Sequence, residues 1–425
     1  MGFNLSGQAW EQAEQALQGK PSGTKFDKYQ KNLQGKKDKE NLRVEHSFII
    51  IEGVIYALSN RKSDMPTDGN QAIVKKGMTK NGTLVAIKIK AQNTLDSSAS
   101  YQLGVQDGLN IAQALRHQPN MKIKKSDGKI IPTDYKLYTV MQWRGDDLIE
   151  KFIELDLTYT QKWLIGLKAC LALTRLHRTG KLHCDFKLDN LTGTIEGNNI
   201  SVNAVDFEFA KKLEIDQHFV SGDKASGSPG FVCPEILSQN RYSFLSDTYA
   251  LAVVLLLQVD VTLQNLSSLY NEYLEDSCAD IREGQVLAPL EWLDLFDVEL
   301  PHKIYGIFKS MLHPDYEKRS DATQMILYLC NKLERDNNLE ENIKKEIKQI
   351  REEHESKLIV SSIENDAQTL QTDMLPLTTN LIFKGPQPVG NQDTAKAPRQ
   401  KISKVRRRSE SDSSISIRSS KKPRF

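Results

Sequence analysis

The chain has 425 residues, of which 39% are hydrophobic, so it can bury one two-lobed core or two domains and still have residues left for tails. Its net charge of +2 is unevenly distributed, because residues 386–425 carry 11 Lys and Arg against 3 Asp and Glu. The remaining residues have a net charge of −6, which argues against a sequence-specific nucleic-acid-binding domain.

The cysteines and the apolar runs bear on the cellular compartment. Five cysteines are scattered without a Cys-x-x-Cys pair, a pattern that predicts reduced thiols in an intracellular protein. The longest apolar run, Tyr249 to Leu257, is far shorter than the roughly 20 residues that a transmembrane helix needs. We therefore expect a buried helix there and no transmembrane segment.

The N-terminal third is predicted to be mainly β-structure. Residues 1–46 are polar and are expected to form a loosely packed extension or a short helix. Three segments rich in Ile and Val then predict strands over Ile49–Leu58, Gln71–Met78 and Thr83–Ile89. The last two are separated by Asn81-Gly82, a strong β-hairpin signal.

A helix is predicted next, over Ser98–Arg116, because its apolar residues recur at helical spacing. Two further strands are predicted over Lys129–Ile131 and Lys136–Met141. From Asp147 onward the pattern is mainly helical, most clearly over Trp163–His177. This order predicts an α+β, bilobal architecture with a β-rich small lobe (47–141) and a mainly helical large lobe (145–333).

The C-terminal part changes character twice. Met325 to Glu355 has a long helical pattern that becomes strongly charged, without a sustained apolar heptad. A solvated or lobe-packing helix is therefore favoured over a coiled coil, and residues 334–366 are predicted to be a charged helical extension. Residues 367–425, rich in Ser, Lys and Arg towards their end, are predicted to be a disordered basic tail.

The segment His183-Cys184-Asp185-Phe186-Lys187-Leu188-Asp189-Asn190 carries the strongest functional signal. It is followed, beyond a β-type pattern, by Asp206-Phe207-Glu208. Phosphoryl transfer needs a carboxylate near the acceptor hydroxyl, an ammonium group near the γ-phosphate, and oxygen ligands for magnesium. A polar turn with a capping Asp is the alternative reading, but it does not predict the second Asp downstream.

Four further segments add to this signal. Val85-Ala86-Ile87-Lys88 places a lysine on an apolar strand, which is a common feature when taken alone. With Gly227–Glu235, Asp247–Leu251 and His313–Ser320, the chain resembles the eukaryotic-type protein kinase family over about residues 47–333. The resemblance implies a bilobal kinase fold and a buried structural ion pair between Glu235 and Arg319.

The resemblance also implies roles in catalysis and metal binding. Asp185 would act as the catalytic base or orient the acceptor hydroxyl, and Lys187 would neutralise charge on the γ-phosphate. The placement of Lys187 is typical of Ser/Thr rather than Tyr kinases. Asn190 and Asp206 would coordinate Mg²⁺, and Ser228 would help to position a Ser or Thr acceptor.

Nucleotide-binding residues are implied in the same way. Lys88 would contact the α- and β-phosphates of ATP, and Met141 would be the gatekeeper beside the adenine. Gln142 and Trp143 would present backbone groups to the adenine, and an acidic side chain at position 146 or 147 would reach the ribose.

Two departures from the family pattern lie in the small lobe. The best register for the glycine-rich loop, Thr67–Val74, keeps only the middle glycine, Gly69, so we expect nucleotide to be held less tightly. No Glu occurs between Lys88 and Glu150. Asp107 is the best substitute as the partner of Lys88, and an ordinary exposed Asp is the alternative.

Two more departures lie in the large lobe. Cys184 stands where an arginine commonly gathers a phosphorylated activation loop, which argues against that form of regulation. Glu208 replaces a glycine, and its carboxylate would either aid a second cation or repel phosphate.

The expected function is ATP- and Mg²⁺-dependent transfer of phosphate to Ser or Thr of protein substrates. A pseudokinase that acts as a nucleotide-binding scaffold or adaptor is the main alternative. Two basic clusters in the tail, Lys404–Arg408 and Lys421–Arg424, resemble a bipartite nuclear-localisation signal. A nuclear import receptor is therefore an expected partner; a basic arm that binds RNA or acidic surfaces nonspecifically in a cytoplasmic protein is the alternative.

Overall fold

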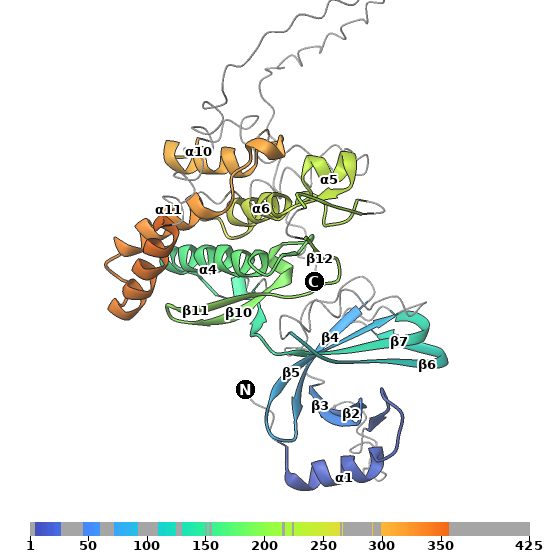
Figure 1. Cartoon of the computed structure of the whole chain (residues 1–425). Coiled ribbons are helices and arrows are strands. Elements are labelled where there is room, and N and C mark those ends of the chain that lie inside the picture. Colours follow the sequence, from blue (N-terminus) through green and yellow to red (C-terminus); the bar gives the residue numbers. More distant parts are fainter. Residues whose placement is uncertain are drawn as a thin grey trace, which may run out of the picture. The chain divides into compact units, whose positions relative to one another are not determined.

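The computed structural model describes residues 5–26, 46–59, 72–91, 109–124, 130–148, 151–152, 155–214, 217–222, 225–263, 266, 291 and 299–356. The predicted disordered tail, Gly69 and Asp107 lie outside these residues. Within them, a sheet-rich N-terminal part precedes a mainly helical C-terminal part, which is the bilobal arrangement that the motifs imply (Figure 1).

A seven-stranded antiparallel sheet forms the small lobe, in the order β1-β2-β3-β4-β5-β7-β6. Its elements are α1 (Gly7–Leu17), β1 (Lys25–Phe26), β2 (His46–Ile51), β3 (Val54–Ser59), β4 (Ala72–Thr79), β5 (Leu84–Ala91), β6 (Asn110–Lys124) and β7 (Ile130–Gln142). The hairpin predicted at Asn81-Gly82 is confirmed, since Met78 pairs with Leu84 and Gly82 has a φ of 87°.

The segment predicted as one strand over Ile49–Leu58 is two strands. β2 and β3 form a hairpin in which Ile51 pairs with Val54 across Glu52-Gly53. Both turn residues have positive φ, 50° and 76°, as a two-residue hairpin turn requires. The turn interrupts a run of Ile and Val that continues on both sides, so hydrophobicity alone did not reveal it.

The helix predicted over Ser98–Arg116 is wrong in its C-terminal half. Residues from Asn110 onward belong to β6, which pairs with β7 so that Arg116 faces Lys136. Residues 98–108 lie outside the described part. The two strands predicted over 129–141 are one continuous strand, β7, which pairs with β5 on its other edge. Pairing with this long strand outweighs the weak helical spacing of residues 109–116.

Helix α1 explains why β2 is buried on both faces. Trp10, Ala13 and Leu17 on α1 pack against Phe48 and Ile50 of β2. The alternate residues of β2 face the other side of the sheet, where the main small-lobe core lies. Part of the predicted N-terminal extension is thus a helix, and it is firmly packed rather than loose.

The large lobe contains the second and larger core. Its elements are β8 (Asp146–Asp147), α4 (Tyr159–His177), β9 (Lys181–Leu182), η3 (Leu188–Asn190), β10 (Leu191–Glu196), β11 (Asn199–Ala204), β12 (Lys211–Lys212), β13 (Val220–Ser221), α5 (Pro234–Gln239), β14 (Arg241–Tyr242), α6 (Phe244–Val253), η4 (Val254–Gln258), α10 (His302–Met311), η5 (Tyr316–Lys318) and α11 (Thr323–Glu334). The helix predicted over Trp163–His177 is confirmed as α4. A capping box formed by Thr158 and Gln161 marks its N-terminus.

The buried helix predicted around Tyr249–Leu257 is confirmed. Residues 249–253 of α6 continue into η4, a π-helical turn, and every residue from Tyr249 to Leu257 is buried. None of the described helices combines the length and apolar character needed to cross a bilayer.

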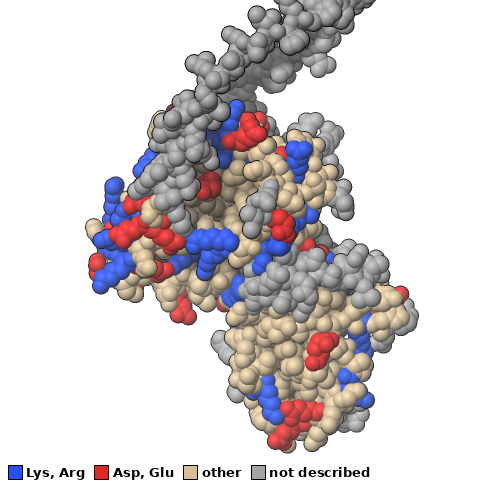
Figure 2. Space-filling model, in the orientation of Figure 1, with Lys and Arg blue, Asp and Glu red and all other residues tan. Residues whose placement is uncertain are grey.

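The long helical pattern over Met325–Glu355 is divided into two helices. α11 ends at Glu334, and a second helix covers residues 341–356. The second helix packs on the large lobe through Ile343 and Ile347, and Arg351 bonds back to Glu334 at 2.8 Å. The lobe-packing alternative is therefore confirmed. On the face in Figure 2, acidic and basic side chains are interspersed.

Candidate active site

The segment His183–Asn190 is the loop between β9 and β10, and Asp247 of α6 holds its backbone. The buried Asp247 carboxylate accepts hydrogen bonds from the backbone N–H groups of His183 (2.7 Å) and Cys184 (2.9 Å). Cys184 has a φ of 63°, a conformation unusual for a non-glycine residue, and these bonds stabilise it. The sequence motif marked Asp247 only as part of a helix, so its effect on the loop was missed.

His183 links this loop to the strand that precedes Asp206. Its ring Nε2 lies 3.0 Å from the carbonyl oxygen of Val205, to which it donates as the Nε2–H tautomer. The N–H of Val205 in turn donates to the carbonyl of Asn190 at 2.9 Å. These two contacts bring the predicted magnesium ligands, Asn190 and Asp206, to the same region.

Asp185, Lys187, Asn190 and Ser228 form one hydrogen-bonded cluster. Ser228 Oγ donates to Asp185 Oδ1 at 2.7 Å and accepts from Lys187 Nζ at 2.6 Å. Asn190 Nδ2 donates to the Asp185 carboxylate at 3.0 Å and to its carbonyl at 2.8 Å. A hydroxyl group therefore fits between the carboxylate of Asp185 and the ammonium of Lys187.

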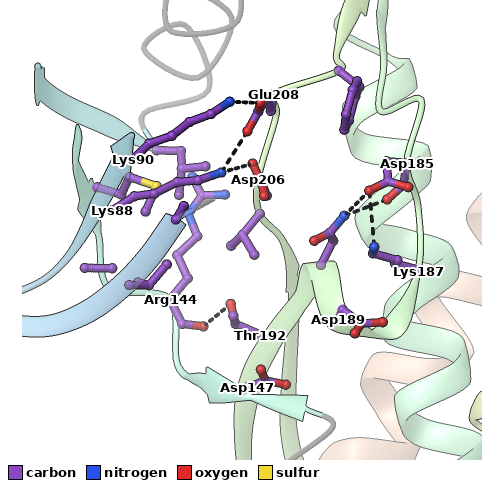
Figure 3. Close-up of a pocket in the computed structure, with 18 of the residues that line it drawn as sticks. Lys88, Lys90, Arg144, Asp147, Asp185, Lys187, Asp189, Thr192, Asp206 and Glu208 are labelled. Carbon is purple, nitrogen blue, oxygen red and sulfur yellow. Dashed lines mark hydrogen bonds and ion pairs between the residues drawn. The ribbon is translucent and has the colours of Figure 1, made fainter. Parts of the chain in front are cut away.

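Lys88 of β5 lies across the cleft and contacts the second acidic motif (Figure 3). Its Nζ is 2.7 Å from Asp206 Oδ1 and 3.2 Å from Glu208 Oε2. Burial lowers the pKa of Lys88, but the two carboxylates outweigh this effect, so its pKa is raised. Burial raises the pKa of Asp206, and the Lys88 ammonium reverses this, so its pKa is lowered. Both groups are therefore charged.

A cleft of about 590 Å³ contains both clusters. Its lining also includes the predicted nucleotide-binding residues Met141, Gln142 and Trp143, with an apolar end formed by side chains such as Ala72 and Val74. The N–H of Gln142 donates to the carbonyl of Leu109 at 2.7 Å, so that N–H is used within the protein rather than for adenine. The predicted candidates Gly69 and Asp107 are outside the described residues.

Two glycines set the connection between the lobes, a feature that sequence reasoning missed. Gly145 has a φ of 105°, and a Cβ atom there would lie 2.3 Å from the carbonyl oxygen of Gly193. The preceding residue, Arg144, accepts hydrogen bonds through its carbonyl from Thr192 and Asn203, both at 3.2 Å. The chain that leaves β7 is thereby fastened to the β10–β11 hairpin, which follows the loop His183–Asn190.

The acidic residues after this connection differ in their surroundings. Asp147 is buried and lines the cleft, which is consistent with the predicted ribose contact. Asp146 instead lies 3.8 Å from Lys76 Nζ and 3.5 Å from Lys151 Nζ.

The ion pair predicted between Glu235 and Arg319 is confirmed. Arg319 donates to both carboxylate oxygens of Glu235, at 2.7 and 3.0 Å, and both side chains are buried. Ser246 Oγ donates to the same carboxylate at 3.0 Å. The pair joins the start of α5 to the segment that precedes α11 and does not line the cleft.

The donor set fits a magnesium nucleotide. Magnesium is held in proteins by one or two carboxylates together with substrate phosphates and water. Asp206 would supply the carboxylate and Asn190 its amide oxygen, since the amide nitrogen is already bonded to Asp185. Phosphate oxygens of the nucleotide and water would complete the coordination.

A family model of the protein kinase domain matches residues 67–331 of the chain. The chain is 25% identical over 282 residues to the hormonally up-regulated neu tumor-associated kinase of Mus musculus, covering 64% of this chain and 36% of that protein. It is 26% identical over 275 residues to myosin light chain kinase A of Dictyostelium discoideum, covering 64% of this chain and 88% of that protein.

A third relative, the serine/threonine-protein kinase DCLK3 of Homo sapiens, is 28% identical over 192 residues, covering 44% of this chain and 28% of that protein. The chain thus spans only about a third of the length of the mouse relative. The family match covers more than half of the chain and includes the residues that form the cleft. The chain belongs to the protein kinase family.

Proposed function

We propose that this chain transfers the γ-phosphoryl group of ATP, in the presence of Mg²⁺, to Ser or Thr hydroxyls of protein substrates. The observation that supports this most directly is the hydroxyl of Ser228, bonded at once to Asp185 (2.7 Å) and Lys187 (2.6 Å). An acceptor hydroxyl held in this way has a carboxylate for its proton and an ammonium group for the developing charge.

In the proposed reaction, the acceptor oxygen attacks the γ-phosphorus while its proton passes to the carboxylate of Asp185. The bond from the γ-phosphorus to the bridging oxygen breaks, and ADP leaves with that electron pair. Lys187 stabilises negative charge at the γ-phosphate, and Lys88 binds the phosphates that remain on ADP. Magnesium held by Asn190 and Asp206 would supply further neutralisation of phosphate charge.

Two features favour a Ser/Thr acceptor on a protein. Lys187 stands two residues after Asp185, the placement that the family resemblance associates with Ser/Thr kinases, and one relative is named a serine/threonine-protein kinase. Residues 227–229, which would lie beside a bound peptide, line the cleft next to Asp185.

A nucleotide-binding pseudokinase is the second candidate. It is favoured by one contact, since Lys88 Nζ is paired with the proposed magnesium ligand Asp206. If this pairing persisted with nucleotide bound, Asp206 would be poorly available for the metal and phosphate transfer would be slow.

Phosphotransfer from radiolabelled ATP by the purified chain separates the two candidates. We expect wild type to label protein substrates, and Asp185→Asn and Asp206→Asn to lower the rate by about a hundred- to ten-thousandfold. Asp185→Asn should retain nucleotide binding because its carboxylate faces the acceptor hydroxyl. Asp156→Asn is a matched control, since Asp156 is exposed and lies outside the cleft. Equally low transfer by wild type and both variants, with nucleotide binding intact, would establish the pseudokinase.

A further inference from the structure

Lys90 is a second lysine in the cleft for which the family resemblance implies no role. Residues two apart on a strand point to the same side, and both Lys88 and Lys90 of β5 line the cleft. Their side chains are only 16% and 28% exposed. β5 therefore directs two ammonium groups, rather than one, into the part of the cleft that contains Asp206.

The carboxylate of Glu208 joins these two ammonium groups (Figure 3). Its Oε2 lies 3.2 Å from Lys88 Nζ, and its Oε1 accepts a hydrogen bond from Lys90 Nζ. One carboxylate that bonds two flexible lysine side chains fixes both relative to each other before any ligand arrives. Such pre-ordering removes part of the rotamer entropy that two lysines would otherwise lose on binding phosphate.

Charge explains why a second acidic group is needed beside Asp206. A magnesium ion held by Asp206 would share its carboxylate, and the hold of Asp206 on Lys88 would weaken. Glu208 is the other carboxylate within 4 Å of Lys88 Nζ among the described residues. It therefore remains available to orient Lys88, and it acts on Lys90 through its second oxygen.

We propose that Lys90 is a second phosphate-binding residue, and that Glu208 is a positioning residue that holds Lys88 and Lys90 side by side for the polyphosphate of ATP. The inference rests on the proposed function, because it concerns the same cleft. It also accounts for two departures in the sequence: a segment with a single glycine where the phosphate loop is expected, and no Glu between Lys88 and Glu150. An additional cation and a carboxylate from the opposite lobe compensate for both.

The affinities of the full chain for ATP and for adenosine, measured in Mg²⁺ by calorimetry, test the role of Lys90. A hydrogen bond between charged groups contributes enough that Lys90→Gln should weaken ATP binding by about tenfold. Adenosine has no phosphate, so its affinity should not change, which also shows that the variant is folded. Lys90→Arg keeps the charge and should retain ATP affinity within about threefold. An equal loss for adenosine and ATP, or no loss for ATP, would overturn the assignment.

A double-mutant cycle tests the role of Glu208. If Glu208 orders Lys90, Lys90→Gln should cost at most about twofold in ATP affinity when Glu208→Gln is already present. If Glu208 instead competes with phosphate, Lys90 would bind phosphate better without it, and the cost of Lys90→Gln would be equal or larger in that background. The second result overturns the positioning role.

The exposed pair Lys212–Glu214, at 3.0 Å, supplies the matched control for both substitutions. Lys212→Gln and Glu214→Gln make the same charge changes outside the cleft, and ATP affinity should be unchanged. Because binding is measured without turnover, the two proposals can fail separately. Absent phosphotransfer with the expected binding results contradicts only the proposed function. Normal phosphotransfer, together with an ATP affinity that Lys90→Gln leaves unchanged, contradicts only this inference.

Discussion

Arg319 and Glu235 show how much a single buried charge depends on its partner. The guanidinium makes two bonds to the carboxylate and two more to the backbone carbonyls of His313 and Leu245, each at 3.0 Å. The guanidinium and the carboxylate are both buried, so each relies on the protein for its hydrogen bonds. The pair therefore fixes the large lobe locally, while its net contribution to stability can be small.

Arg319→Ala should lower the free energy of unfolding by about 3–5 kcal/mol, because it leaves the Glu235 carboxylate buried without its cation. Urea unfolding at neutral pH measures the loss. Lys318→Ala, the exposed neighbour with a 69% exposed side chain, is the control and should change stability by less than about 0.5 kcal/mol. A loss of that small size for Arg319→Ala would contradict the prediction.

The same pair predicts a direction for pH dependence. Burial raises the pKa of Glu235, but the bonds and charge of Arg319 outweigh burial, so its pKa is lowered. Stability from this carboxylate is therefore complete above its unfolded pKa and is lost as the pH falls through the lowered folded value. The difference between wild type and Arg319→Ala should accordingly be smaller in acid than at neutral pH in the same unfolding measurement.

At the scale of elements, α1 shows that a segment outside the matched kinase region contributes to the small lobe. The family match begins at residue 67, yet α1 covers one face of β2 and β3. Trp10 is 5% exposed and its ring meets that of Phe48 edge to face, with centroids 5.1 Å apart. Without this helix, a row of apolar side chains on the sheet would face water.

Trp10→Ala should destabilise the small lobe by about 3–5 kcal/mol, the usual cost of truncating a buried aromatic residue. Thermal unfolding, followed by the fluorescence of the remaining tryptophans, measures this. Gln15→Ala on the exposed side of α1 is the control and should leave the melting temperature nearly unchanged. Equal melting temperatures for the two variants would show that α1 is not part of the cooperative unit.

At the scale of the whole molecule, the charge of the chain is divided between a mildly acidic body and a basic C-terminal arm. The arm contains the two clusters that resemble a bipartite import signal. We propose that it directs the kinase to the nucleus through an import receptor and takes no part in phosphate transfer.

Removal of residues 385–425 should abolish nuclear accumulation of a fluorescently tagged chain in a eukaryotic cell, with phosphotransfer by the purified chain unchanged. Alanine at Arg406, Arg407 and Arg408 should have the same effect on location, because it removes one of the two clusters. As a control, Ser413, Ser414 and Ser416, which lie between the clusters, are replaced by alanine, and nuclear accumulation should be retained. Continued nuclear accumulation without the arm would contradict the import signal, and lost phosphotransfer would contradict a purely addressing role.

Several parts of the fold and site followed from local sequence. Asn81-Gly82 predicted its hairpin, the helical pattern over Trp163–His177 predicted α4, and the motif at 183–190 predicted the cluster around Asp185. Each depends on residues close together in the chain, where backbone preference and side-chain chemistry act directly. The hairpin at Glu52-Gly53 did not follow, because the apolar run continues on both sides of its turn. Strand β6 did not follow, because strand pairing overrides weak local preference.

The sequence by itself determined the family and the bilobal fold, and it supplied the groups that we propose for phosphate transfer, because those depend on residue types at fixed spacing. Only the tertiary structure decided two contacts that no motif predicted. It placed Glu208 between Lys88 and Lys90, and it bonded the backbone of the loop His183–Asn190 to Asp247. The physical reason is that these contacts join residues 63 to 120 positions apart. Their distances are set by packing between the lobes for Glu208 and by packing within the large lobe for Asp247, rather than by local preference.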